Sequence, residues 1–279
     1  MITVLMKAEN RRDEEQAEAE ERSSPSGAVV YKAVLKEGME EMERPSSALF
    51  WSGVAAGLSM GASLIAEGLL GSHLPDAGWK PLLTKFGYSV GFIVVILGRQ
   101  QLFTENTLTP ILPLMRERTW KRLRNVLRLW AVVLAANLLG CLAVAWATSR
   151  EAVFSDEVRS EFATISRQAM EGSFGHHLLH AIFAGWLIAL MVWVLPFAES
   201  ARFWVIVLLS YLVGLGHFSH IVAGAVQTFY GAFDGDSSWQ AVFGNYLFPT
   251  FIGNVIGGVA LVAAINHAQV VSGTQHHEI

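Results

Sequence analysis

The sequence predicts an all-α membrane protein whose six transmembrane helices form two inverted repeats of three helices each. Three observations support this prediction: an apolar composition, six long segments with few charges, and short motifs that occur in both halves of the chain. Of the 279 residues, 52% are hydrophobic and 16% are charged, whereas about 25% are charged in a typical soluble protein. A water-soluble domain of this size could not bury so much apolar surface, and a single cysteine excludes a disulfide scaffold.

The first 44 residues are polar and account for the net charge of the protein. They hold 11 acidic and 7 basic side chains, which gives the formal net charge of −4. Residues 1–27 are low in complexity, and we expect a disordered acidic tail on the cytoplasmic side. Residues 28–44 place apolar side chains among Lys and Glu, which predicts an amphipathic helix on the membrane surface. The alternative is a solvated helix that packs on nothing.

The transmembrane domain is predicted over 45–269, and a cytoplasmic C-terminal tail is predicted over 270–279. The six apolar segments cover 45–66, 86–115, 129–149, 177–198, 203–230 and 243–267. Each is near or above the length of about 20 residues that a bilayer requires. Buried helices of a large soluble protein can mimic one such segment, but hardly six in one short chain.

Basic residues are distributed unevenly between the connecting loops. Outside the tail, the side that holds both termini carries ten Lys and Arg residues, and the opposite side carries five. Because cytoplasmic loops carry the excess of basic residues, both termini are predicted to be cytoplasmic.

Two of the six segments contain glycines and polar residues near their centres. Residues 98–107 (GRQQLFTENT) interrupt the second segment, and residues 214–220 (GLGHFSH) interrupt the fifth. Irregular backbone at this depth is tolerated only where it is buried in protein or lines a cavity. Helices 2 and 5 are therefore predicted to be broken.

Motifs from the first half of the chain return in the second half. Residues 102–104 (LFT) resemble 217–219 (HFS), which lie 115 positions later, and 137–140 (NLLG) resemble 254–257 (NVIG), which lie 117 positions later. Because each copy holds three helices, the second copy must cross the membrane in the opposite direction. Inverted repeats with paired broken helices indicate a transport pathway near the midplane of the bilayer.

These motifs resemble those of the formate/nitrite transporter family, which are aquaporin-like anion channels. The resemblance covers 45–269 and is strongest at 102–104, at 253–258 (GNVIGG) and at His220. The stretches 48–70 and 99–106 are most similar to a branch of inner-membrane members whose substrate is poorly defined. The resemblance implies a six-helix bundle in a bacterial-type inner membrane, one pore per protomer and a pentamer.

The resemblance also implies a substrate pathway. The central histidine of the family falls on His220, and its loop threonine falls on Thr104. Two apolar constrictions are implied as well, one on the cytoplasmic side and one on the periplasmic side. The cytoplasmic constriction falls on Leu102 and Val213, and the periplasmic constriction falls on Tyr88, Phe92 and Ile188.

Several positions depart from the pattern of the family. Val213 stands where Phe is usual, and Tyr88 replaces an expected Phe. Gly185 and Gly224 stand where the family often has Asn, so two polar partners of the histidine are missing. The remaining departures are Arg99, where the family favours Gly, and Glu105, where it favours a small residue.

His220 is the best candidate for a functional group, because an ionisable side chain inside a bilayer is costly and usually functional. Imidazole titrates near physiological pH, so a proton could pass between His220 and an entering anion. Thr104 can donate a hydrogen bond to an oxygen of the substrate. The alternative is a structural role, in which His220 bonds a carbonyl that the break leaves free. For His217, three residues earlier, a structural role is preferred over a role in the pore.

Four residues are expected to brace the breaks. Arg99 and Glu105 flank the first break and are predicted to pair, since buried charges are normally paired. The alternative is that Arg99 attracts anions into the pore. Asn137 and Asn254 are predicted to join helices to the carbonyls that the breaks set free.

No other chemistry is indicated. His176 and His180 are spaced as metal ligands can be, but together with His177 they are expected to form a solvated cluster without metal. No motif of an enzyme, a cofactor site or a nucleic-acid-binding module is present. We therefore predict a channel or transporter for a small monovalent anion, similar to formate or nitrite, in which the central histidine could couple transport to protons. The alternatives are a pore for a small neutral solute and a closed membrane scaffold or sensor that acts through the N-terminal tail.

Overall fold

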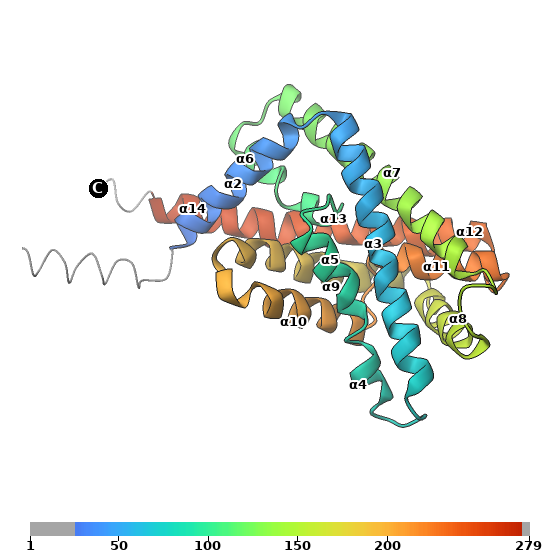
Figure 1. Ribbon diagram of the computed structural model, residues 1–279. Coiled ribbons are helices and arrows are strands. Elements are labelled where there is room, and N and C mark those ends of the chain that lie inside the picture. The colour runs from blue at the N-terminus through green and yellow to red at the C-terminus, as the bar shows by residue number, and fades with distance from the viewer. Residues whose placement is uncertain (1–25, 275–279) are drawn as a thin grey trace, which may run out of the picture.

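The computed structural model describes residues 26–274, and that part of the chain contains helices and loops but no strand (Figure 1). The tail predicted over 1–27 lies outside the described residues except for its last two positions. Of the tail predicted over 270–279, only 270–274 are described, as the end of helix α14 (Ile265–Thr274). The all-α class is confirmed.

Six crossings are formed, as predicted. Five helical stretches among the described residues are long and apolar enough to span a membrane. They contain α3 (Ser46–His73), α5 (Tyr88–Leu97), α7 (Trp120–Thr148), α9 (Phe174–Val194) and the final stretch Trp239–Val270. The sixth crossing is shared by α10 (Arg202–Leu215) and α11 (Ala223–Asp234), each of which is too short to span a bilayer alone.

The second crossing is broken as well. Helix α5 ends at Leu97, and the chain then runs through an irregular loop with one 3-10 turn, Glu105–Thr107, before α6 (Ile111–Arg116) begins. The final stretch contains α12 (Trp239–Ala241), α13 (Phe248–Ile256) and α14, joined by π-helical segments at Val242–Leu247 and Gly257–Ala264. The broken helices 2 and 5 are therefore both present.

Three features of the helices were not predicted. Helix α7 begins nine residues before its apolar segment, because the Thr119 hydroxyl accepts a hydrogen bond from the Arg122 amide at 3.3 Å and caps the helix. The loop before α5 contains α4 (Lys80–Thr84), and the loop before α9 contains α8 (Asp156–Met170). Helix α8 buries an apolar face centred on Phe162 against α3 and α11.

The N-terminal helix α2 (Gly27–Glu43) packs on the bundle. Its apolar residues Tyr31, Val34, Leu35 and Met42 are buried, mainly against α6 and α14. The protein itself thus covers this face of α2. Figure 1 shows α2, α6 and α14 at one end of the molecule and α8 at the opposite end. These ends are called the α2 side and the α8 side below.

The two breaks have the same backbone hydrogen bonds, which defines how the repeats correspond. In the first break, the amides of Gly98, Arg99 and Gln100 donate to the carbonyls of Val94, Ile96 and Val95, respectively. In the second break, the amides of Gly216, His217 and Phe218 donate to the carbonyls of Leu212, Gly214 and Val213 in the same order. Each donor of the second break lies 118 positions after its counterpart. The register of 115 predicted from side chains is therefore wrong, and Leu102 corresponds to His220. The inverted repeat itself is confirmed.

One buried asparagine holds each break. In the first repeat, Asn137 Nδ2 donates to the carbonyls of Gly53 and Gln101 at 2.8 and 2.9 Å, and its Oδ1 accepts from the Phe103 amide at 2.9 Å. The amide group therefore ties α7 to α3 and to the loop after α5. Both carbonyls and the amide would otherwise lack a partner in a water-free region.

The second repeat uses the same device. Asn254 Nδ2 donates to the carbonyls of Ala181 and Ser219 at 2.8 and 3.0 Å, and its Oδ1 accepts from the Ile221 amide at 2.9 Å. Glycines bring the paired helices close enough for these bonds. A Cβ atom added at Gly185 of α9 would overlap the carbonyl oxygen of Asn254, so a larger residue does not fit there.

We predict that Asn137→Ala and Asn254→Ala each destabilise the protein by about 1–3 kcal/mol, because each change leaves buried backbone groups without partners. The thermal unfolding midpoint of the detergent-purified protein measures the effect. Asn266→Ala is the matched control, since within the described residues Asn266 bonds only the carbonyl of Val262, one turn earlier in the same helical stretch. A loss in the control as large as in the other two variants would contradict the bracing role.

Candidate functional site

The two breaks meet through a hydrogen bond between their side chains. Thr104 lies in the loop after α5 and His220 in the loop after α10, and Thr104 Oγ1 lies 2.8 Å from His220 Nε2. Both side chains are fully buried. The rings of Phe92 and His220 form a T-shaped contact, with centroids 5.1 Å apart. The structure thus brings together the polar residues that the sequence places at the centre of the pathway.

The hydrogen bonds of His220 define which nitrogen carries its proton. The amide of Ala223, in the first turn of α11, donates to His220 Nδ1 at 3.1 Å. Nδ1 is therefore an acceptor without a hydrogen, and the neutral ring must carry its proton on Nε2. Nε2–H then donates to Thr104 Oγ1, which leaves the hydroxyl proton of Thr104 available for another acceptor. Protonation of Nδ1 would require loss of the bond from Ala223.

The apolar residues that the sequence assigns to the two constrictions are also buried. Phe92, Leu102, Ile188 and Val213 are all fully buried. Leu102 directly precedes the loop residues that hold Thr104, and Phe92 contacts both His220 and Tyr88, whose ring centroid is 5.4 Å away. An ion that moves through this region would lose nearly all of its water.

The structure places Val213 beside Tyr88. It lines a cavity on the α8 side together with Tyr88, and a Cβ added at the next residue, Gly214, would lie 2.8 Å from the Tyr88 ring. Helices α5 and α10 run side by side in opposite directions, so the last turn of α10 meets the first turn of α5. Val213 therefore lies near Tyr88, and its pairing with Leu102 in one constriction stays a prediction.

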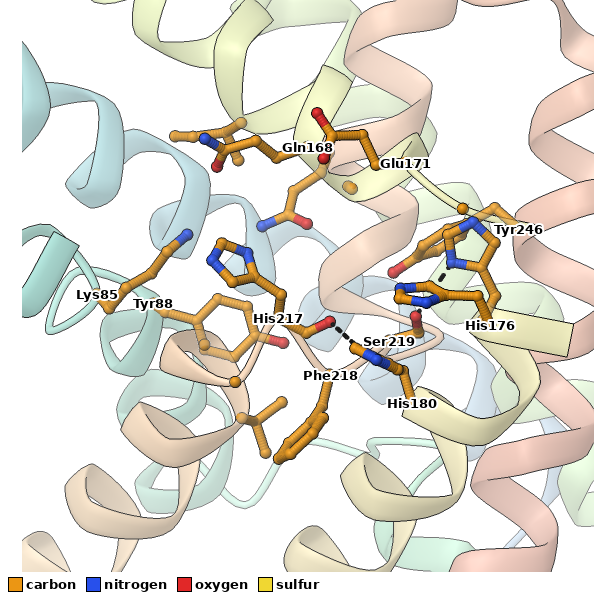
Figure 2. A pocket seen from close by; sticks show the side chains of 18 residues that line it. Lys85, Tyr88, Gln168, Glu171, His176, His180, His217, Phe218, Ser219 and Tyr246 are labelled. Carbon is orange, nitrogen blue, oxygen red and sulfur yellow. Dashed lines mark hydrogen bonds between the residues drawn. The ribbon is translucent and has the colours of Figure 1, made fainter. Parts of the chain in front are cut away.

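The cavity on the α8 side has a volume of about 470 Å³ and is rich in histidine (Figure 2). In Figure 2 the His217 ring and the Lys85 ammonium group point toward each other. His180 Nδ1 donates to the His217 carbonyl at 3.1 Å and so fixes the turn that carries His217. His176 stacks near His180, with centroids 3.9 Å apart. Among the described residues, no group of three His, Cys, Asp or Glu side chains is placed to hold a metal ion.

A second cavity, of about 490 Å³, lies on the α2 side. Arg99, Glu105 and the α2 residues Glu37 and Glu41 contribute to its wall. Arg99 and Glu105 form no ion pair in the described part of the chain. The loop between them turns into the protein to bury Thr104, which separates the two side chains. The predicted Arg99–Glu105 pair is therefore wrong.

Glu41 braces this loop instead. Its carboxylate accepts hydrogen bonds from Gln101 Nε2 at 3.2 Å and from the Thr109 hydroxyl, and Gln101 Oε1 accepts from Asn106 at 3.0 Å. Burial raises the pKa of Glu41 to about 7, although both hydrogen bonds lower it. No pattern in the sequence predicts this contact, because Glu41 lies among several similar residues in an acidic stretch.

Two further contacts were missed. Glu67 and Lys85 form a buried ion pair of 2.6 Å beside the α8-side cavity. The sequence could have indicated this pair, since Glu67 directly follows the first apolar segment and Lys85 directly precedes the second, so both lie on the same side of the membrane. Buried charges of opposite sign normally pair. The second contact is that of Tyr246, whose hydroxyl group lies against Gly224 and fills the space that a side chain at that position would occupy.

Comparison with known proteins gives a consistent result. The model of the protein family described as formate/nitrite transporter matches residues 28–268 of this chain. The chain is 40% identical over 268 residues to the inner membrane protein YfdC of Escherichia coli strain K12, and the alignment covers 96% of this chain and 86% of that protein. It is 24% identical over 243 residues to the formate channel BtFdhC of Bacillus thuringiensis, which covers 84% of this chain and 91% of that protein.

Solved structures show the same fold. An ion channel described as a member of the FNT family matches with a TM-score of 0.75 and 18% identity, over 85% of this chain and 96% of that one. A pentameric formate channel with formate bound matches with a TM-score of 0.63 and 20% identity, over 79% of this chain and 95% of that one.

We predict that Glu41 makes the docking of α2 depend on pH. Because folding raises its pKa from the ordinary value of 4.5 to about 7, its stabilising effect is complete below about pH 4.5 and is lost as the pH rises through about 7. The thermal unfolding midpoint should fall between about pH 5 and pH 8 by more in the wild type than in Glu41→Gln. Glu40→Gln is the control, since the one ion pair of Glu40 within residues 26–274 is an exposed pair with Lys36. Parallel pH curves for wild type and Glu41→Gln would contradict this role.

Proposed function

The chain belongs to the formate/nitrite transporter family, and we propose on this premise that it conducts a small monovalent anion of the size of formate or nitrite across the membrane. The anion would pass from one cavity to the other between Thr104 and His220, past the apolar residues Leu102, Phe92 and Ile188. The observation that carries the proposal is the hydrogen bond between Thr104 and His220, because it leaves one hydroxyl proton free at a fully buried position where the two breaks meet.

The pair Thr104–His220 would act as a neutral hydrogen-bond donor. Nε2–H of His220 orients the Thr104 hydroxyl, whose proton then points to the oxygen of the anion. Hydrogen bonds to charged groups are stronger than neutral ones, so this single donor offsets part of the cost of dehydration. His220 orients the donor and keeps its Nε2 proton. Release of that proton would require Nδ1 to take up another, and Nδ1 is occupied by the Ala223 amide.

The arrangement of the chain ends supports an orientation in the membrane. Tyr31 of α2 bonds His267 of α14 through its hydroxyl at 2.8 Å, so both ends of the described chain lie on the α2 side. That side also carries the larger number of basic residues in short loops. We place the α2 side in the cytoplasm of a bacterial-type inner membrane, in accordance with the distribution of basic residues.

We also propose that the protein assembles as a pentamer with one pore in each protomer. The pentameric formate channel to which it is similar supports this assembly. Large apolar side chains on the outside of the bundle, such as Trp51, Trp204 and Leu208, are exposed in the single chain and are available for neighbours or lipid. The mass of the protein in mild detergent should equal five chains of 30.5 kDa. Native mass spectrometry measures this, and a monomer or dimer as the main species would overturn the assembly.

Thr104→Val should reduce anion flux at least about tenfold, because it removes one hydrogen bond to a charged group while keeping the shape of the side chain. Uptake of formate and nitrite into proteoliposomes measures the loss. Thr104→Ser keeps the hydroxyl and is the matched control, with flux near that of the wild type. His220→Asn should also lose flux.

The outcomes separate the candidate functions. Unchanged flux in Thr104→Val would remove the threonine from the pathway. Wild-type protein that is correctly assembled but passes neither formate nor nitrite would overturn the anion channel. Uptake of a neutral solute in the same vesicles, independent of membrane potential, would then favour the neutral-solute pore.

A further inference from the structure

Arg99 and His217 are equivalent residues of the two repeats and share an unusual backbone conformation. Both have φ of 50°, and among the described residues other than glycine only these two have positive φ. A side chain makes this conformation unfavourable, and glycine adopts it without strain. Strain of this kind is retained at functional sites. The chain thus places two cationic or titratable side chains where glycine would fit better.

Each of these side chains reaches into one of the two cavities. Arg99 is exposed in the cavity on the α2 side, and His217 is exposed in the cavity on the α8 side. Arg99 has no hydrogen bond or ion pair within the described residues, although Glu37 lies near enough for its charge to be felt. The turn that ends α5 therefore presents Arg99 to one entrance of the pathway, and the turn that ends α10 presents His217 to the other.

The cavity on the α8 side also holds a polar atom that needs a partner. His177 is 1% exposed, its Nδ1 lies 3.3 Å from the Ser219 hydroxyl, and its Nε2 has no hydrogen-bond partner. A buried polar nitrogen without a partner is costly, and His177 lines the same cavity as His217. A ligand with acceptor atoms in this cavity would satisfy Nε2–H when the ring carries its proton there.

The charge of this cavity changes with pH. The groups that face His217 are Lys85 and Glu171, the imidazoles of His176, His177 and His180, and the hydroxyls of Tyr88 and Tyr246. Lys85 is already paired with the buried carboxylate of Glu67. At about pH 8 Glu171 therefore leaves the cavity with a net negative charge, and protonation of the exposed His217 ring in acid adds a positive charge.

The cavity on the α2 side differs in this respect. Its cation at the equivalent position, Arg99, stays charged at every physiological pH. Three further cations, Lys36, Arg44 and Arg202, line the same cavity together with the acidic residues Glu37, Glu40, Glu41 and Glu105. At the two equivalent positions, the pseudo-symmetric entrances thus carry a permanent cation on one side and a titratable side chain on the other.

We propose that the cavity on the α8 side is a second binding site for a small monovalent anion, held by His217 and charged by acid, and that Arg99 is its permanently charged counterpart on the α2 side. The proposal rests on the proposed function, because the site would load the pathway that leads to Thr104. It makes entry of the anion from the α8 side depend on protonation of His217, whereas on the α2 side Arg99 keeps its charge and pH acts through the carboxylates of that cavity.

The test measures anion currents in planar bilayers with the pH of each compartment set separately. Acidification of the α8-side compartment from about pH 8 to about pH 5.5 should lower the half-saturating formate concentration for entry from that side severalfold. His217→Gly should abolish this response and leave the maximal current nearly unchanged. Glycine relaxes the positive φ, so the variant is expected to fold. Arg99→Gly is the matched control, which should keep the response and weaken entry from the α2 side at every pH.

His217→Arg separates charge from structure. A permanent cation at this position should give the low half-saturating concentration at both pH values. If His217→Gly keeps the full pH response, or if His217→Arg still responds to pH like the wild type, the proposed site is wrong.

A second measurement does not depend on conduction. Sodium formate, compared with sodium chloride at equal concentration, should raise the thermal unfolding midpoint of the purified protein at about pH 5.5 and not at about pH 8. The rise should be absent in His217→Gly and present at both pH values in His217→Arg. Absence of formate-specific stabilisation in the wild type at acidic pH would overturn the site. Stabilisation without any anion current would instead keep the site and overturn the proposed channel.

Discussion

The need to satisfy backbone groups inside a bilayer governs this structure. Two helices are broken near the midplane, and each break frees carbonyls and amides that water cannot reach. Asn137 and Asn254 each bond two carbonyls and one amide. Because these bonds join the break to two neighbouring helices, they also fix the position of the residues in the break. The central pair Thr104–His220 depends on this support.

The inverted repeat makes the backbone of the two breaks nearly symmetric, but the side chains at equivalent positions differ. The position equivalent to His220 is Leu102, and the position equivalent to Arg99 is His217, as the hydrogen bonds of the two breaks show. Each repeat therefore supplies one polar partner of the central pair, from non-equivalent positions. A symmetric frame of this kind offers two similar entrances, and substitutions at single positions give each entrance its own charge.

The central histidine illustrates how local structure limits chemistry. Its Nδ1 accepts the first-turn amide of α11, so the proton of the neutral ring belongs on Nε2, where it meets Thr104. The sequence leaves open whether His220 has a structural or a functional role, and the geometry combines both. The ring completes the start of a helix, and for that reason its other nitrogen can orient a hydroxyl toward the path.

The length and polarity of the segments were enough to predict six crossings, two breaks and an inverted repeat, since these follow from local composition and the thickness of a bilayer. The sequence also placed Asn137, Asn254, Thr104 and His220 near the breaks. Only the tertiary structure showed the correct repeat register, the place of Val213 beside Tyr88, the bracing by Glu41 and the separation of Arg99 from Glu105. The reason is physical: hydrophobic pattern fixes where a helix runs, but which side chains meet depends on how opposed half-helices pass each other.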